Sequence, residues 1–533
     1  MGDAERFEAV CRAMGDPAFY PHPVLKLERR ETHISVVFLT GEWVYKIKKP
    51  VALGFLDFRN LEDRRRFCER ELSLNRRLSR GVYQDVVAVR ESDGNGFTLH
   101  GRGRIVEYAV KMRQLPEASS LEQCLIKEAK VGLQDMRDLG RRLAAFYKTG
   151  QRDVEIDRYG RRDIIAFNME ENFRQLEPVA RDLLDLERWE FLCQVSRTFL
   201  EHHYDLFEHR IKAGRVCDGH GDLRADHIYF YDGVQIIDCI EFNDRFRYGD
   251  AVSDLAFLHM DLEHLNRPAW SGALLAGYVE EAQDPELYAL IDFYATYRAI
   301  VRLKVTALRL QQVRQAQRES LAQEARRYMA QAYRYAMQFG RATLWVFCGL
   351  PATGKSHLAK MVSEALWIPV FQSDRVRKQS GFGRPDVVGY AQGPYRPGMR
   401  QQVYAHMLGL AQDMLKAGRS AILDATFSRR GWRQSARQLA IDWDANLVFV
   451  ECVCPEETIR SRLKKRAKEF GLSDARLEHL PQMMAEFEPV VEPEPQYHLV
   501  IQTEQPANRA LTELLSQGYD RRRRQVSDRI ARG

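Results

Sequence analysis

The sequence has 533 residues, 45% of them hydrophobic and 29% charged, which is long enough for two or three domains. Its net charge of +6 is a mild bias, and its nine cysteines include no Cys-x-x-Cys pair. We find no apolar run near the length of a membrane span and no N-terminal basic segment followed by an apolar one. These features argue against a secreted disulfide scaffold, a zinc site or a membrane span, and we expect a reducing, cytoplasmic compartment.

Segment 35–48 predicts two strands around a tight turn. Lys46 and Lys48 are two residues apart, so they fall on the same side of the second strand. A lysine in the middle of a strand normally needs a charged partner, and the following helix near 67–74 offers Glu71. We expect a Lys46–Glu71 pair that aims the ammonium group at nucleotide phosphates.

Segment 217–238 predicts a polar loop followed by two short strands joined at an Asp-Gly turn. The strands bring Asp222 and Asp238 together. Phosphoryl transfer needs such a pair, because one carboxylate orients the attacking hydroxyl while the other holds Mg²⁺. For His220 in the same loop, a buried role that shapes the loop through hydrogen bonds is favoured over direct chemistry.

One or two long helices are predicted from 303 to 338, and a short buried strand from 344 to 348. The chain continues as Gly349-Leu-Pro-Ala-Thr-Gly354-Lys355-Ser356, a Gly-x-x-x-x-Gly-Lys-Ser/Thr pattern. Glycines let backbone N–H groups turn around phosphates, the lysine reaches the outer phosphate oxygens, and the serine hydroxyl can ligate Mg²⁺. A helical pattern follows, so its N-terminus faces the phosphates. The nucleotide-binding residues expected here are Gly349, Thr353, Gly354, Lys355 and Ser356.

Three further strands are predicted beside that loop. Asp374 and Asp424 each follow a strand, and the third strand leads into a helix that carries Arg462 and Arg466. One carboxylate could accept a substrate hydroxyl proton while the other organises Mg²⁺ and water. The arginines could close over the transferring phosphoryl group. The alternatives are that Asp374 caps a helix and that the arginines form a solvated face.

Residues 342–505 resemble the small P-loop kinases that phosphorylate hydroxyls of small molecules or nucleic-acid ends, such as zeta toxins, polynucleotide 5′-kinases and gluconate-type kinases. The matching features are the 349–356 loop, Ser373-Asp374-x-x-Arg377 and Asp424-Ala-Thr426, and Ser473-Asp474-Ala475 adds a further likeness. The resemblance implies that Asp374 is the general base. The metal ligands expected in this half are Ser356 and Asp424. It does not indicate the acceptor.

Residues 30–300 resemble the aminoglycoside phosphotransferase-like branch of the protein-kinase fold. The loop around Asp222 matches that family's catalytic loop, which makes Asp222 the implied catalytic base. Asp238 matches the metal-binding aspartate, with Glu241 as a competitor. The segment 108–116, with Met112 inside it, resembles the connection between the two lobes beside the adenine. Gly249-Asp250-x-x-x-Asp254 matches the structural aspartates that follow.

Two positions in the kinase-like half depart from the family pattern. His227 stands where the family usually carries the Asn that ligates a metal, and Arg224 replaces the second His of the loop. Imidazole is a poorer Mg²⁺ ligand than an amide oxygen. The half could therefore bind metal differently through His227, work slowly or have lost catalysis.

We therefore predict a mixed α/β multi-domain chain with a protein-kinase-like α+β domain followed by a P-loop NTPase parallel α/β domain. The expected segments are a kinase-like domain at 1–302, connecting helices at 303–340, a P-loop kinase domain at 341–510 and a basic C-terminal tail at 511–533. For the tail, a solvated terminus is favoured over a nucleic-acid contact.

The whole arrangement resembles bacterial fusions of an aminoglycoside phosphotransferase-like domain with a P-loop ATP-binding domain. It implies a bifunctional ATP- and Mg²⁺-dependent kinase that acts on a hydroxyl of a small molecule. Two alternatives stay open: a polynucleotide 5′-hydroxyl kinase, and a nucleotide-sensing regulator whose kinase-like half is not catalytic. No membrane partner is expected, and the sequence indicates neither the acceptor nor the oligomeric state.

Overall fold

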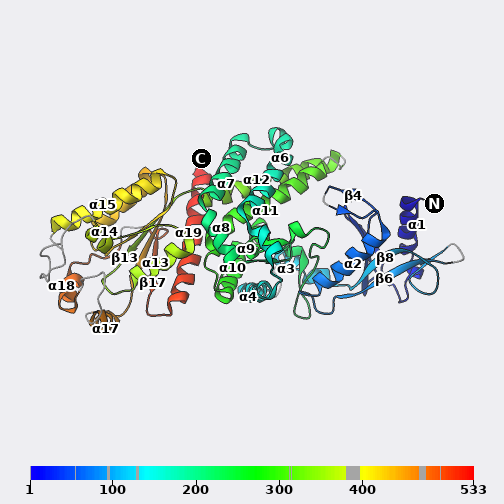
Figure 1. The fold of residues 1–533 in the computed structure, drawn as a ribbon, viewed down its shortest axis with the longest axis horizontal. Helices are drawn as coiled ribbons and strands as arrows, with labels where there is room; N and C mark the ends of the chain where they lie inside the picture. The colour runs from blue at the N-terminus through cyan, green and yellow to red at the C-terminus, as the bar shows by residue number, and fades with distance from the viewer. Residues whose placement is uncertain are drawn as a thin grey trace. The chain divides into compact units, whose positions relative to one another are not determined.

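The computed structural model describes residues 2–54, 56–92, 96–127, 131–310, 313, 315–379, 397–466, 476–491 and 494–532. The Ser-Asp-Ala motif at 473–475 lies outside these residues. The chain forms two compact units, each made of two separate stretches of sequence. Figure 1 traces the chain through its helices and strands by residue number. Unit 1 holds Met1–Ile164 and Glu208–Leu274, and unit 2 holds Ile165–Phe207 and Leu275–Gly533. None of the described helices is long and apolar enough to span a membrane.

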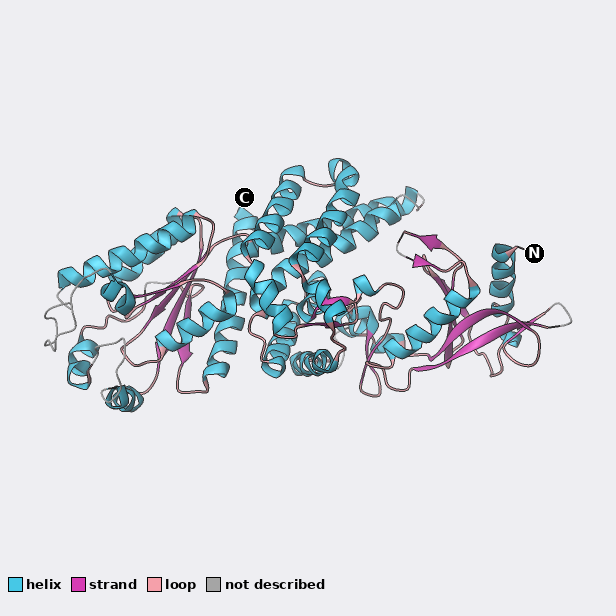
Figure 2. Cartoon of the chain, in the orientation of Figure 1, coloured by secondary structure: helices cyan, strands magenta, loops and turns pink. Residues whose placement is uncertain are grey.

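Unit 1 begins with an antiparallel six-stranded sheet in the order β1-β2-β3-β8-β6-β7 (Figure 2). Its strands are β1 (Glu28–Glu31), β2 (Ser35–Leu39), β3 (Trp43–Lys48), β6 (Tyr83–Glu91), β7 (Phe97–Thr98) and β8 (Arg104–Arg113). A two-stranded hairpin of β4 (Ala52–Leu53) and β5 (Leu56–Asp57) lies between β3 and the helix α2 (Leu61–Asn75). The tight turn predicted inside 35–48 is present at Gly41, which has φ of 98°.

Both faces of this sheet are covered by helices. Tyr45 and Ile47 pack with residues of α1 (Asp3–Met14) on one face. Val44 and Met112 pack on the other face with Cys68 of α2. Because side chains alternate along a strand, Lys46 and Lys48 point to the same side as Val44, toward α2.

The rest of unit 1 is mainly helical, with two small antiparallel pairs of strands. One pair is β9 (Val216–Asp218) with β12 (Tyr248–Asp250), and the other is the predicted hairpin of β10 (Ile228–Phe230) and β11 (Val234–Ile236). The helices are α3 (Leu121–Ile126), α4 (Leu133–Thr149), α5 (Val154–Asp157) and α9 (Ala251–His264). Three helices cross a boundary between the units: α6 (Arg162–Leu183), α8 (Tyr204–Lys212) and α10 (Pro268–Ala282).

Unit 2 contains the long helices predicted near 303–338. They are α11 (Leu287–Leu310) and α12 (Gln315–Phe339), which pack on each other, and α7 (Leu186–His202) packs against α12. The segment 303–340, expected to connect the two halves, therefore packs within unit 2.

The second part of unit 2 is a parallel five-stranded sheet in the order β14-β15-β13-β16-β17. The strands are β13 (Thr343–Cys348), β14 (Val370–Gln372), β15 (Ala421–Asp424), β16 (Asn446–Val453) and β17 (His498–Gln502). The helices are α13 (Lys355–Leu366), α14 (Ser373–Gln379), α15 (Pro397–Lys416), α16 (Arg430–Asp442), α17 (Glu456–Arg466), α18 (Leu480–Ala485) and α19 (Ala507–Arg532). The predicted mixed α/β fold class, with a parallel sheet in the second half, is confirmed.

The segment expected to be a basic tail belongs to α19, which packs against β16, β17, α12 and α13. Its apolar residues Leu514, Leu515 and Tyr519 are buried. The Gln525 side chain also makes hydrogen bonds of 3.0 and 2.9 Å with the backbone N–H and carbonyl of Leu447 in β16. The described residues of this segment are therefore part of the fold rather than a frayed terminus.

Candidate functional sites

The predicted phosphate-binding loop joins β13 to α13. Gly349 and Gly354 have φ of 135° and 91°, and a Cβ on Gly349 would lie 2.5 Å from the Cys452 carbonyl oxygen, so only glycine fits there. Inside the loop, Thr353 Oγ1 donates to the Leu350 carbonyl at 2.8 Å. The helix starts at Lys355 with no side-chain cap, which leaves its first N–H groups directed at the loop. This geometry suits an anion at the helix start.

Arg462 of α17 lies against the backbone of this loop. Its guanidinium group donates to the Ala352 carbonyl at 3.2 Å and to the Thr503 carbonyl at 2.8 Å. Thr503 Oγ1 in turn donates to the Thr353 carbonyl. Ala352 has a positive φ of 64°, a conformation that costs a residue with a side chain about 1–2 kcal/mol. These contacts stabilise the conformation of the loop. Arg466 is exposed at the end of α17, and the catalytic roles of Arg462 and Arg466 stay predictions.

Asp424 at the end of β15 lies behind the loop and is 2% exposed. Burial raises the pKa of its carboxyl group, against the opposing effects of Lys355 and of a hydrogen bond from Ser356. One of its oxygens, Oδ1, has no hydrogen-bond partner among the described residues. A buried, unpartnered carboxylate oxygen beside a serine hydroxyl fits a hard cation such as Mg²⁺, which prefers oxygen ligands.

Asp374 lies in the first turn of α14, so it does not occupy the helix-capping position. Arg377 donates to its carboxylate at 3.3 Å, and the carboxylate remains 34% exposed. Tyr404 and Thr426 share a hydrogen bond of 3.1 Å. Burial raises the pKa of Tyr404 to about 12, and the charge of Asp374 adds to the increase. The loop, Asp424 and Asp374 therefore follow neighbouring strands at the same edge of the sheet, as predicted.

In unit 1, Lys46 lies 2.8 Å from Glu71 and 2.6 Å from Asp238, so the expected lysine–glutamate pair is present. Lys48 also pairs with Glu71 at 2.8 Å and with Glu241, and its side chain is fully buried. Although burial opposes the charge, Asp238 and Glu71 raise the pKa of Lys46. Burial raises the pKa of Glu241, whereas the Asp238 side chain is 44% exposed. Asp238, rather than Glu241, thus presents the accessible carboxylate.

The loop that carries Asp222 is held in place by buried side chains. Asp254 accepts hydrogen bonds from the backbone N–H groups of His220 and Gly221, at 2.5 and 2.8 Å. His220 is fully buried, with Nε2 3.0 Å from the Ile237 carbonyl and Nδ1 3.3 Å from the Asp222 N–H. These partners fit a neutral ring that donates from Nε2 and accepts at Nδ1. Burial lowers the pKa of His220 to about 4, which supports the structural role favoured for it.

His227 lies between Asp222 and Asp238. Its ring is 3.6 Å from a carboxylate oxygen of each, and Nδ1 is 2.9 Å from the Asp222 carbonyl. Burial opposes protonation, but the carboxylates of Asp226 and Asp222 together raise the pKa of His227. Imidazole is a poorer Mg²⁺ ligand than an oxygen donor, and Asp238 is already paired with Lys46. These residues fit Mg²⁺ poorly, and among all described residues no cluster of three His, Cys, Asp or Glu is arranged to hold a metal.

The other positions predicted for this half are also located. Met112 lies in β8, is 7% exposed and packs with Val44, Tyr83 and Ile237, so its predicted place beside an adenine remains a prediction. Arg224 forms an ion pair of 2.5 Å with Asp226.

Sequence reasoning missed the contacts of Thr503 and of Lys48. Thr503 directly follows β17, so the rule that ligands meet the carboxyl ends of parallel strands could have found it. Lys48 and Glu241 are 193 residues apart, and no local pattern links them.

Two family models match the chain. One is described as a phosphotransferase enzyme family and covers residues 68–294, and the other is described as an AAA domain and covers residues 344–490. They confirm the predicted order of a phosphotransferase-family domain followed by a P-loop-type domain. Curated relatives include an uncharacterized protein of Mycobacterium tuberculosis and one of Mycobacterium bovis. Each is 34% identical over 467 residues, covering 86% of this chain and 90% of the relative.

Similar solved structures include the GDP and kanamycin complex of APH(2")-IIia, with 16% identity and a TM-score of 0.38, covering 62% of this chain and 98% of that chain. A gluconokinase from Sinorhizobium meliloti has 17% identity and a TM-score of 0.25, covering 33% of this chain and 91% of that one. The Mycobacterium tuberculosis APS kinase CysC in complex with AMPPNP and APS has 18% identity and a TM-score of 0.25, covering 33% of this chain and 97% of that chain.

Proposed function

We propose, from the premise that this chain belongs to the same family as its mycobacterial relatives, that it is an ATP-dependent phosphotransferase acting on a hydroxyl group of a small molecule. The two domain matches support a phosphotransferase in general, and the site geometry supports the finer statement. The P-loop half is the principal active centre in this proposal.

One observation carries the proposal: the 349–354 loop with its uncapped helix start and the buried Asp424 behind it. Main-chain N–H groups would surround the phosphates of ATP, and Lys355 would neutralise their outer oxygens. Ser356 and Asp424 would hold Mg²⁺, which spreads the negative charge that develops on the phosphates during transfer. The unpartnered Oδ1 of Asp424 supports this assignment.

Asp374 is the proposed general base. Its partly exposed carboxylate would accept the proton of the acceptor hydroxyl while the hydroxyl oxygen bonds to the γ-phosphorus and the bond from that phosphorus to ADP breaks. Arg377, 3.3 Å away, would keep the carboxylate oriented before the acceptor arrives.

In the kinase-like half, Lys46 would meet the nucleotide phosphates and Asp222 would orient a second hydroxyl. A competing function for this half is nucleotide sensing without catalysis. It is supported by the position of His227 between Asp222 and Asp238, which leaves a poor set of Mg²⁺ ligands. We derive no metal-dependent step for this half.

The polynucleotide kinase alternative gains no support beyond the P-loop resemblance. The basic residues that motivated it lie in α19, where Arg523 pairs with Asp520 and Arg529 pairs with Asp444.

Separate substitution of the two halves tests the proposal. In full-length protein with ATP, Mg²⁺ and a panel of hydroxyl metabolites, we expect Lys355→Ala to remove most ATP turnover, by about 100-fold or more, because it removes the charge that offsets the transferring phosphates. Asp222→Ala should leave the ATP turnover of the P-loop half intact. It should remove only the smaller turnover that remains in the Lys355→Ala protein. A Lys355→Ala protein with unchanged turnover would show that the principal centre lies elsewhere. If the residual turnover of Lys355→Ala is zero while ATP still binds, the kinase-like half is a sensor.

A further inference from the structure

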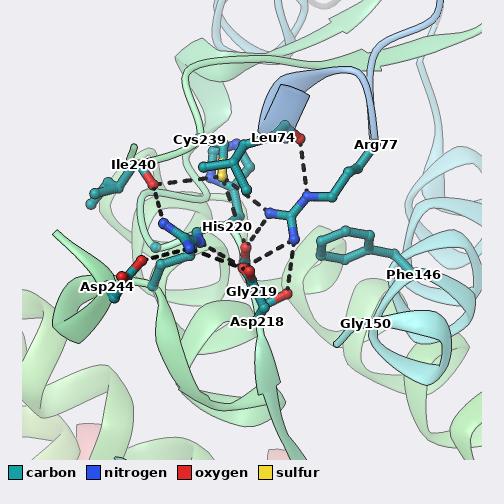
Figure 3. Close-up of polar contacts among 12 residues, drawn as sticks. Leu74, Arg77, Phe146, Gly150, Asp218, Gly219, His220, Cys239, Ile240 and Asp244 are labelled. Atoms are coloured by element: carbon teal, nitrogen blue, oxygen red, sulfur yellow. Dashed lines mark hydrogen bonds and ion pairs between the residues drawn. The ribbon is translucent and has the colours of Figure 1, made fainter. Parts of the chain in front are cut away.

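Arg77 is the second residue after α2 and donates to four acceptors in the loop that carries Asp222 and beside Asp238 (Figure 3). Its Nη1 lies 3.0 Å from Asp218 Oδ1 and 3.2 Å from the Asp218 carbonyl. Its Nη2 lies 2.7 Å from the Gly219 carbonyl and 3.3 Å from Cys239 Sγ. Its Nε bonds back to the Leu74 carbonyl at 3.0 Å, so all three nitrogens are engaged.

The Arg77 guanidinium is also packed, because its plane lies over the ring of Phe146 from α4, with 5.1 Å to the ring centroid. Its side chain is only 26% exposed. A planar group that is fixed by five hydrogen bonds and a stacked ring has little freedom to move.

Asp218 is shared with a second arginine. Arg247, whose side chain is 1% exposed, lies 2.6 Å from Asp218 Oδ1 through Nε and 2.9 Å from the Ile240 carbonyl through Nη1. Asp218 is 5% exposed, and its buried carboxylate is paired with both guanidinium groups. The two arginines therefore clasp the start of the Asp222 loop and the segment after Asp238 at one point.

The contacts of Arg77 connect the segments that carry the site residues Glu71, Asp222 and Asp238. Glu71, six residues before Arg77, pairs with Lys46. Asp218 lies four residues before Asp222, and Cys239 follows Asp238. Asn75, at the end of α2, adds a parallel tie, because its side chain accepts the Cys239 N–H at 2.9 Å.

We propose that Arg77 is a positioning residue, which holds the Lys46–Glu71 pair in register with Asp222 and Asp238. It acts through Asp218 and Gly219 and touches no nucleotide. The proposal rests on the phosphotransferase function proposed above for the kinase-like half. It implies that α2 is fixed to the loop in the free protein, so that no swing of this helix is needed to form the lysine–glutamate pair.

The test uses the full-length protein carrying Lys355→Ala, so that remaining ATP turnover comes from the kinase-like half. Into it are introduced Arg77→Met, Arg77→Lys and Asp218→Asn. The matched control is Arg66→Met, which removes an arginine of α2 that is 67% exposed, pairs with Asp63 at the surface and lies over the ring of the adjacent Phe67. For each protein, kcat, KM for ATP and the dissociation constant of ADP are measured well below the unfolding temperature, with the folded state checked by circular dichroism.

We expect Arg77→Met to lower kcat about 10- to 100-fold, because small misplacements of reacting groups have effects of that size. The ADP dissociation constant should change less than threefold, since the strand face that carries Lys46 is kept. Arg77→Lys should recover part of kcat, Asp218→Asn should resemble Arg77→Met, and Arg66→Met should change neither constant.

Unchanged kcat in both Arg77→Met and Asp218→Asn would overturn the positioning role. So would a loss of kcat that merely follows the fraction of unfolded protein, with Arg77→Lys no better than Arg77→Met. If the Lys355→Ala parent itself has no turnover, the catalytic function proposed for this half fails, and the positioning role is overturned with it. An active parent with an equally active Arg77→Met protein rejects the positioning role alone.

Discussion

At the scale of single residues, the site of the kinase-like half is built from charges that neutralise one another in pairs. Two lysines share Glu71, and each has a second carboxylate of its own. Removing one member of such a buried group leaves an uncompensated charge, which costs several kcal/mol. Of these two lysines, Lys46 is the one with a partly exposed partner, Asp238. Lys46 is therefore the lysine that could exchange a carboxylate for a phosphate.

The buried neutral His220 predicts a dependence of stability on pH. Its folded pKa of about 4 lies below the ordinary value of 6.5, so acid protonates the unfolded chain first. The stability that His220 contributes is complete above pH 6.5 and is lost as pH falls toward 4, by about 3–4 kcal/mol at about 1.4 kcal/mol for each pKa unit. Urea unfolding at pH 7.5, 6 and 5 measures this loss.

His220→Asn is the comparison for that measurement. Its amide oxygen can accept from the Asp222 N–H as Nδ1 does, and the side chain does not titrate. The unfolding free energy of His220→Asn should fall less steeply with acid than that of the unchanged protein. Equal slopes for the two proteins would mean that His220 is not held neutral.

For single residues, the sequence predicted which side chains carry the charges of the site better than it predicted their long-range contacts. The Lys46–Glu71 pair followed from strand periodicity and one nearby acidic residue, and it is present. The bond from Lys48 to Glu241 could not be predicted, because it depends on how the hairpin after Asp222 returns to the sheet. The loop at 349–356 was predictable in detail, since each of its residue types is required by the backbone geometry.

At the scale of elements, α19 shows why a charged run can hide a packed helix. Four consecutive arginines at 521–524 favoured a solvated tail. Yet Leu511, Leu515, Tyr519 and Val526 recur at spacings of four and seven residues and are all buried on one face. That apolar spacing was the available signal, and the basic residues lie around it.

The close packing of α19 on β13 predicts an unusual effect of a glycine substitution. A Cβ on Gly518 would lie 2.5 Å from the buried ring of Trp345. Gly518→Ala should therefore destabilise unit 2 by about 1–3 kcal/mol, as overpacking does. The measurement is the unfolding midpoint in urea or on heating.

Gly409 in α15 is the control, because it is exposed and a Cβ there would meet nothing within 4 Å. Gly409→Ala should stabilise the protein by about 0.5–1 kcal/mol, the ordinary effect in a helix. Opposite signs for the two substitutions are the expected result. A stabilising Gly518→Ala would mean that α19 does not approach Trp345 as described.

At the scale of the whole molecule, the units do not follow the chain order. Residues 165–207 belong to unit 2 although the sequence on both sides of them belongs to unit 1. No sequence pattern predicted this, because α6 and α7 have the same amphipathic character as helices that stay in one unit. The domain limits inferred from the sequence, including the boundary at 340, remain predictions.

A fragment of residues 1–340 should therefore not behave as an independent kinase domain. It would contain α11 and α12 without α19, so Asp292, 4% exposed and bonded to Tyr519 at 2.7 Å, would lose that bond. Apolar residues of α12 would also face water. We expect this fragment to aggregate on gel filtration and to bind a hydrophobic dye, unlike the full-length protein. A monodisperse fragment that binds ATP would contradict this.

The clasp of Gln525 on Leu447 has a consequence for biosynthesis. The Leu447 backbone in β16 is hydrogen-bonded by the Gln525 side chain, which lies 78 positions further along the chain. Gln525 therefore leaves the ribosome well after the strand that it contacts. The phosphate-binding half therefore reaches its final packing only after residue 525 has emerged. Until then the nascent chain exposes the face that α19 will cover, and that interval is when chaperones would engage it.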